Sequence, residues 1–122
     1  MAYTVYDLIG GATAVDAAVA LFYRKVLADG RVSEFFDGVD MERQIRKQKA
    51  FLTMVLGGPV AYTGKDMRAA HAPLVARGLS DSHFDVVVEH LGATLTELGV
   101  PPELVGHVAT EAEALRRDIL GR

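Results

Sequence analysis

The sequence predicts an all-α protein, and three observations support that prediction. Apolar residues recur at spacings of three and four along four main segments, which is the pattern of helices with one buried face. No segment shows the sustained alternation of apolar and polar residues that a half-buried strand requires. Glycines and prolines stand between the segments, where they end helices and form short connectors. We therefore expect four main helices around one core.

The composition indicates a globular protein and excludes several other classes of protein. The 122 residues are 50% apolar and 24% charged, so we expect one globular domain over residues 1–122. A net charge of −3 predicts no partner among nucleic acids or anionic lipid surfaces, and the absence of cysteine excludes disulfides, thiolate metal sites and a cysteine nucleophile. No apolar run approaches the roughly 18 residues of a membrane span, and the N-terminus lacks a secretory pattern. We expect a soluble, cytoplasmic protein with no membrane partner.

The first long helix is expected to begin just after Thr13, a suitable N-cap, and to end near Gly30. Before it, Gly10 and Gly11 allow the backbone to take positive φ. Residues 31–39 are too few for a sizeable helix. We expect a turn or a single helical turn there that carries two phenylalanines inward.

The second long helix is expected to follow Asp40 as its N-cap and to reach about Leu56, where the run Gly-Gly-Pro ends it. Residues 59–65 have the composition of a loop. A short helix is expected over residues 66–76, and Pro73 should bend it or confine it to a few turns.

The last two helices have clear start signals. Ser80 is the expected N-cap of a helix that ends at Gly99. Pro101 and Pro102 begin the final helix, because proline costs no hydrogen bond in the first turn. Its apolar stripe predicts one continuous helix as far as Ile119.

Polar residues interrupt the buried stripe of the helix that follows Asp40. Gln44 and Gln48 fall on the same face as its apolar residues, with Lys47 on the flank and Phe51 continuing the series. An amide buried without a partner costs about 1–3 kcal/mol. Either the glutamines pair internally and line a polar pocket, or the helix is rotated and both reach solvent. The pattern leaves these alternatives open.

Aromatic residues are concentrated in one part of the chain. Five of the nine lie within 30 residues: Phe22, Tyr23, Phe35, Phe36 and Phe51. Flat rings beside hydrogen-bonding groups suit a flat, largely apolar ligand. The alternative is an ordinary aromatic core.

Of the four histidines, His71 is the one expected to face inward, because it follows two alanines and precedes Leu74. A histidine on an apolar face is more often a satisfied core residue than a ligand. His83 and His90 share a helix face, but about 10 Å separates them, so one zinc ion cannot bind both without other ligands. We expect His90 to lie in solvent.

Several segments in order resemble the group I truncated haemoglobins over nearly the whole chain. The first is LIGGATAVDAAVALFYRKVLAD; then come FF-x-x-VDM, QKAFLxxxxGG, Y-x-G-x-x-MRxAH, HFDxxxEHL and the LGVP junction. This resemblance implies a truncated globin fold, in which a two-over-two helical sandwich surrounds haem.

The resemblance also implies roles for individual residues. His71 matches the proximal histidine that binds the haem iron, and Tyr23 matches the distal tyrosine that donates to the iron's ligand. Gln44 and Gln48 match the two positions that complete that hydrogen-bond network. The remaining haem contacts that it implies are aromatic packing by Phe35, Phe36 and Phe51, propionate contacts by Arg43, Tyr62 and Lys65, and a haem-edge contact by Met67.

Two positions depart from the cyanobacterial relatives. Lys47 stands where some of them carry a histidine that fills the sixth coordination site of the iron. A neutral Lys47 amine is one candidate for that site, which would make it a second metal ligand; the alternative is a lysine that reaches a propionate or solvent. Leu115 stands where those relatives carry a histidine that bonds covalently to haem, so we expect non-covalent haem b (iron protoporphyrin IX).

The expected function is reversible binding of dioxygen, nitric oxide and carbon monoxide. The family favours nitric oxide dioxygenation or other handling of reactive nitrogen, with an unknown external reductase, because no phosphate-binding glycine loop for flavin or nicotinamide occurs here. A non-enzymatic gas sensor or electron-transfer haem protein is one alternative. A haem-free helical interaction module is another.

Overall fold

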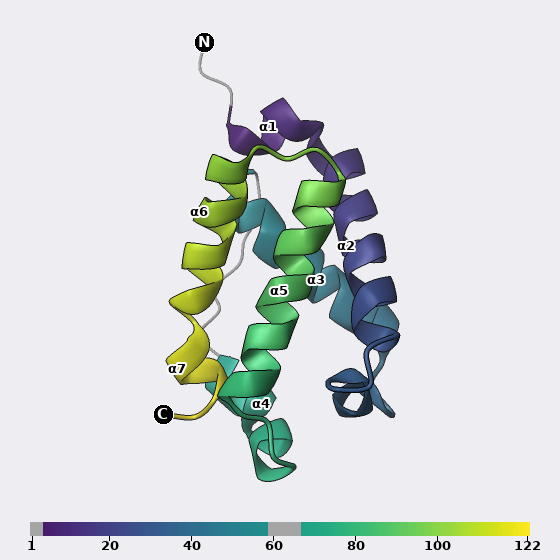
Figure 1. The fold of residues 1–122 in the computed structure, drawn as a ribbon, viewed down its shortest axis with the longest axis vertical. Helices are drawn as coiled ribbons and strands as arrows, with labels where there is room; N and C mark the ends of the chain where they lie inside the picture. Colours follow the sequence, from purple (N-terminus) through teal and green to yellow (C-terminus); the bar gives the residue numbers. More distant parts are fainter. Residues whose placement is uncertain (1–3, 59–66) are drawn as a thin grey trace.

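The computed structural model describes residues 4–58 and 67–122, and every regular element within these ranges is a helix (Figure 1). The expectation of an all-α fold is therefore confirmed. None of the helices in these ranges is both long and apolar enough to cross a membrane. In chain order the elements are α1 (Val5–Ile9), α2 (Gly11–Leu27), the 3-10 turn η1 (Ser33–Phe36), α3 (Met41–Val55), α4 (Met67–Ala76), α5 (Asp81–Glu97), α6 (Pro102–Glu113) and α7 (Arg116–Ile119).

Two helix pairs form the body of the molecule. α2 packs on α3, α5 packs on α6, and α2 also crosses α5. In Figure 1 the chain descends along α2 and returns obliquely along α3 at the back of the view, then ascends along α5 and descends along α6, so each pair is antiparallel. The side chains at the centre come from all four helices: Val15, Val19 and Val26 of α2, Leu52 of α3, Leu91 and Leu95 of α5, and Val108 of α6.

The short helix α1 was not expected from the sequence, because five residues are too few to show a helical period. A capping box begins it: the Thr4 hydroxyl accepts from the Asp7 backbone N–H, and the Asp7 carboxylate accepts from the Thr4 N–H. The Tyr6 N–H donates to the carbonyl oxygen of Leu56 at 2.8 Å, which holds α1 against the end of α3. At Gly58 a Cβ would stand 2.7 Å from the Tyr6 ring, so this close approach requires glycine.

The start of α2 differs from the prediction. The helix begins at Gly11, without Thr13 as its N-cap. Gly10 at φ 118° ends α1 and Gly11 at φ 65° begins α2, so a single residue, Gly10, separates the two helices. The positive φ expected at this pair is confirmed.

Most of the other boundaries follow the sequence. Residues 33–36 form the single turn expected between the first two long helices, and the Asp40 carboxylate caps α3 by accepting from the Arg43 N–H at 3.3 Å. α4 runs through Pro73 to Ala76. Ser80 caps α5. The expected loop over residues 59–65 lies outside the described residues.

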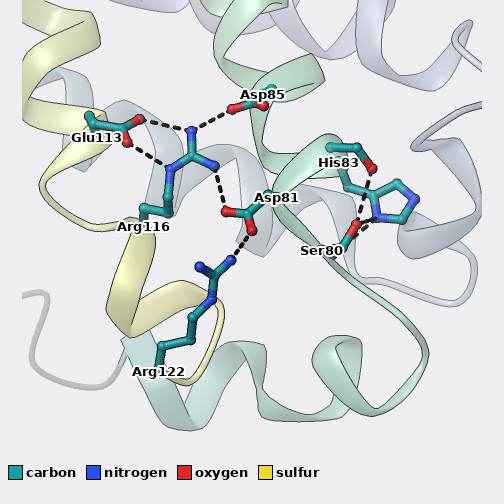
Figure 2. A network of polar contacts seen from close by, with 8 residues as sticks. Ser80, Asp81, His83, Asp85, Glu113, Arg116 and Arg122 are labelled. Carbon is teal, nitrogen blue, oxygen red and sulfur yellow. Dashed lines mark hydrogen bonds and ion pairs between the residues drawn. The ribbon is translucent and has the colours of Figure 1, made fainter.

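The prediction of one continuous final helix is wrong. α6 ends at Glu113, and the separate turn α7 begins at Arg116. The break allows the guanidinium of Arg116 to turn toward the first turn of α5, where it meets Asp81 and Asp85 (Figure 2). An apolar stripe cannot reveal this interruption, because the buried positions continue on both sides of it.

Candidate functional site

A buried tyrosine lies where α2 faces α3. Tyr23 is 4% exposed, and the Gln44 Nε2 amide of α3 donates a hydrogen bond to its hydroxyl at 3.1 Å. The rings of Phe22 and Phe36 meet the Tyr23 ring edge-on, with centroids 4.9 Å and 5.9 Å away. The Tyr23 side chain is therefore surrounded by aromatic rings, and its hydroxyl has one polar partner, Gln44.

The direction of this hydrogen bond determines what Tyr23 can still do. Because the amide is the donor, the phenolic hydrogen of Tyr23 remains available to a further acceptor. Within the described part of the chain, Gln44 is the only hydrogen-bond partner of that hydroxyl. Burial raises the pKa of Tyr23 to about 12, against the opposing effect of the Gln44 hydrogen bond. The phenol is thus a hydrogen-bond donor throughout the neutral pH range.

The face of α3 that carries Gln44 is mixed in polarity. Gln44 and Gln48 are half-buried one turn apart, and Phe51 is buried in the turn that follows. Gln44 hydrogen-bonds to Tyr23, which agrees with the alternative in which the glutamines pair internally and not with the one in which they reach solvent. Lys47 of the same helix is exposed.

The other expected site residues are spread over three elements. His71 is half-buried on α4, and Arg43 is exposed in the first turn of α3. Phe35 is buried in η1 but contacts Arg77 and His83, whereas Phe36 contacts Tyr23. Tyr62 and Lys65 lie outside the described residues, as does the side chain of Met67, whose backbone begins α4.

The expectation that His90 lies in solvent is wrong. Its Nε2 lies 2.7 Å from the carboxylate of Asp29, and both side chains are largely buried. Hydrogen bonds from Arg31 first, and then from His90, hold the pKa of the Asp29 carboxyl well below its usual range. This pairing joins α5 to the connector that follows α2. The sequence carries no local signal for it, because 61 residues separate the partners.

Comparison with known proteins gives consistent matches over nearly the whole chain. A family model described as bacterial-like globin matches residues 4–120. The group 1 truncated hemoglobin of Tetrahymena thermophila is 49% identical over 119 residues, which are 98% of this chain and 96% of that protein. The group 1 truncated hemoglobin of Synechocystis is 50% identical over 122 residues, covering 98% of each chain.

Solved structures agree in fold. The truncated hemoglobin of Tetrahymena pyriformis in its Fe(III) form matches with a TM-score of 0.86 and 48% identity, over 98% of this chain and 100% of that one. The 2/2 hemoglobin of Synechococcus in the cyanomet state, with covalently attached heme, matches with a TM-score of 0.90 and 46% identity over the same shares.

The solved Tetrahymena pyriformis proteins include three single variants. One replaces a tyrosine by phenylalanine, and two replace glutamines by glutamate. In that protein the tyrosine precedes the first glutamine by 21 residues, and the second glutamine follows four residues later.

Two antiparallel helix pairs with this degree of structural agreement define a globin of the two-over-two kind. The chain belongs to the bacterial-like globin family and, within it, to the group 1 truncated hemoglobins. Membership implies haem binding and the haem-based binding of diatomic gases such as oxygen.

Proposed function

We propose that this protein reversibly binds dioxygen, nitric oxide and carbon monoxide at a haem held by His71. Tyr23, Gln44 and Gln48 would donate hydrogen bonds to the bound gas. The observation that carries this proposal is the geometry at Tyr23: a buried phenol accepts from the Gln44 amide and keeps its own hydrogen for a ligand. Donors that are fixed in a site of low dielectric stabilise a polarised ligand strongly.

The spacing of these donors supports their assignment. Tyr23 precedes Gln44 by 21 residues, and Gln48 follows four residues later. The tyrosine and glutamines replaced in the Tetrahymena pyriformis variants have the same spacing. These positions are therefore the first ones to test for gas binding in this chain.

The residues present fit a haem. The His71 imidazole on α4 is the kind of side chain that binds haem iron, while the partly buried ring of Phe36, the buried ring of Phe51 and the phenol of Tyr23 suit a planar apolar group. We assign haem b, with propionate or edge contacts from Arg43, Tyr62, Lys65 and Met67.

The haem is proposed to be non-covalent. Leu115, at the break between α6 and α7, offers no side chain that could bond to a vinyl group. Acid and organic solvent should therefore extract all the haem. Pigment retained by the polypeptide after extraction would contradict this assignment.

We further propose nitric oxide dioxygenation as the chemistry. Dioxygen, nitric oxide and one electron would combine to one nitrate ion, and an external reductase would replace that electron. The haem supplies the gas-binding position and the electron. The polypeptide would hydrogen-bond the gas through Tyr23 and Gln44 and limit the access of water to it.

The experiment uses haem-loaded ferrous protein. After dioxygen binds, nitric oxide is added anaerobically, and nitrate and the ferric spectrum are measured. One nitrate per haem supports the proposal. Simple displacement of dioxygen by nitric oxide, without nitrate, would favour a gas sensor or an electron-transfer protein. Absence of a haem spectrum after reconstitution would favour a haem-free interaction module.

Lys47 raises a separate question about the resting state. It lies on α3 between the two glutamines, and its side chain is exposed. To bind iron as a sixth ligand when no gas is present, the side chain must turn inward and release its proton. Lys47→Ala should then change the visible spectrum between pH 6 and 10. An unchanged spectrum would assign Lys47 to solvent or a propionate.

A further inference from the structure

A cluster outside the tyrosine site joins η1 to both α4 and α5. We call Phe35, Arg77 and His83 the Phe35 clasp. The Arg77 guanidinium lies 5.8 Å from the Phe35 ring centroid and donates to the carbonyl oxygen of Glu34 at 2.9 Å. The imidazole of His83 meets the same ring edge-on at 4.8 Å. His83 of α5 and Arg77, directly after α4, therefore both contact one buried ring.

His83 is itself fixed in place. Its Nδ1 accepts a hydrogen bond from the Ser80 backbone N–H at 3.1 Å and lies 3.1 Å from the Ser80 hydroxyl, as Figure 2 shows. These contacts belong to the N-terminal cap of α5. The imidazole of His83 thus contacts Phe35 from a fixed position, and the guanidinium of Arg77 makes the second contact with that ring.

The clasp is connected to the tyrosine site through one peptide unit. Phe35 and Phe36 are consecutive residues of the short turn η1, and their rings go to different neighbours. Phe35 lies in the clasp, whereas the Phe36 ring meets Tyr23 at 5.9 Å. A shift of η1 would therefore move a ring that contacts the Tyr23 ring.

The clasp also reaches the helix of the proposed iron ligand. Arg77 directly follows α4, which carries His71, and its backbone N–H donates to the Leu74 carbonyl oxygen at 3.0 Å. A single guanidinium thus links the end of the helix that carries His71 with the turn that carries Phe36.

We propose that Arg77 is a positioning residue for Tyr23, acting through Phe35 and Phe36. This inference rests on the proposed function, because the property it tunes is the hydrogen bond from Tyr23 to a bound gas. Two interactions of Arg77 hold η1: its cation lies within about 6 Å of the Phe35 ring, and its charged guanidinium donates to the Glu34 carbonyl oxygen. Methionine at this position would keep apolar contact with Phe35 but lose both interactions.

The test compares Arg77→Met with Arg117→Met, which removes an exposed guanidinium from α7. Each substitution is made alone and in combination with Tyr23→Phe, and all variants are measured as haem-loaded protein. The dioxygen dissociation rate is measured by stopped flow. The ¹³C shift of the Tyr23 ring in the carbon monoxide complex gives a second readout.

We expect Arg77→Met to raise the dissociation rate about threefold or more and to move the Tyr23 signal, while Arg117→Met does neither. With Tyr23→Phe already present, Arg77→Met should add almost nothing, because both changes act on one hydrogen bond. Arg77→Lys keeps a cation beside the ring. It should therefore show at most half of the logarithmic change in dissociation rate that Arg77→Met shows.

Different results overturn different claims. If Tyr23→Phe leaves dioxygen dissociation unchanged, the proposed role of Tyr23 is wrong. If Tyr23→Phe speeds dissociation but Arg77→Met and Arg77→Lys do not, only the inference about Arg77 is wrong. If Arg77→Met has the same effect with and without the tyrosine hydroxyl, Arg77 acts by another route and the positioning role is rejected.

Discussion

Two polar regions of this molecule differ in both number of contacts and burial. At the tyrosine site one hydrogen bond, from Gln44 to Tyr23, lies among buried rings. In the second region Arg116 of α7 contacts Glu113 at 2.7 Å, Asp81 at 2.8 Å and also Asp85 (Figure 2). The Arg116 guanidinium also lies 4.4 Å over the Phe84 ring.

The comparison shows that the number of polar contacts does not indicate which group can still bind a further partner. The three carboxylates around Arg116 are each more than half exposed, so solvent screens these ion pairs and each adds little. In that cluster the charges already have partners. At Tyr23 the phenolic hydrogen has no acceptor among the described residues, and a hydrogen bond made at such a buried position is strong.

The largest expected effect is on gas release. Tyr23→Phe removes the donor and should raise the dioxygen dissociation rate of the haem-loaded protein by about 10- to 100-fold, since a hydrogen bond to a charged partner contributes about 1.5–3 kcal/mol. Stopped-flow mixing measures this rate. Tyr6→Phe, on α1, is the matched control and should leave the rate unchanged.

Alkaline pH provides a second test of the buried phenol. Because the pKa of Tyr23 is raised to about 12, the folded state holds this proton more tightly than the unfolded state, whose tyrosines titrate near pH 10. The resulting stability, about 2–3 kcal/mol, is fully present below pH 10 and is lost as pH rises toward 12. Urea unfolding at several pH values should show this loss in the natural sequence but not in Tyr23→Phe. Equal losses in both would place the phenol in solvent.

A smaller effect is expected at the Arg116 cluster. Arg116→Met should lower the free energy of unfolding by about 1 kcal/mol, and added salt should reduce the difference, because these ion pairs are exposed. Arg117→Met on the same turn is the control for loss of one charge. A change in dioxygen dissociation comparable with that of Tyr23→Phe would break the division between the two regions.

The smallest effect concerns acid stability. Hydrogen bonds from Arg122 and Arg116 hold the pKa of Asp81 below its ordinary value. The stabilisation is therefore present above about pH 4 and is lost as pH falls below it. Thermal melts between about pH 3 and 6 should show a shallower decline for Asp81→Asn. Asp37→Asn, an exposed carboxylate outside this cluster, should follow the natural sequence.

Much of the site could be predicted because helical register is local. The glutamines of α3 conflicted with its apolar stripe, and the structure shows why Gln44 is tolerated there: its amide has a buried hydroxyl as partner. What pattern alone could not provide was that partner, since a helical stripe does not identify which residue of another helix it will face. The resemblance to a known family supplied Tyr23.

Other features had no local signal. The capping box of α1 was present in the sequence as Thr4 and Asp7, but too few residues followed to show a helix. The contact of His90 with Asp29 depends on how α5 crosses the end of α2. No spacing within α5 encodes that crossing.

The sequence by itself determined which residues share a helix face and where glycine or an N-cap sets most of the helix boundaries, because these properties depend on neighbours within one or two turns. Only the tertiary structure decided that Arg77 lies over Phe35, that His90 meets Asp29, and that the last helix breaks before Arg116. Each of these depends on the rotation and crossing of packed helices, which the whole core sets together.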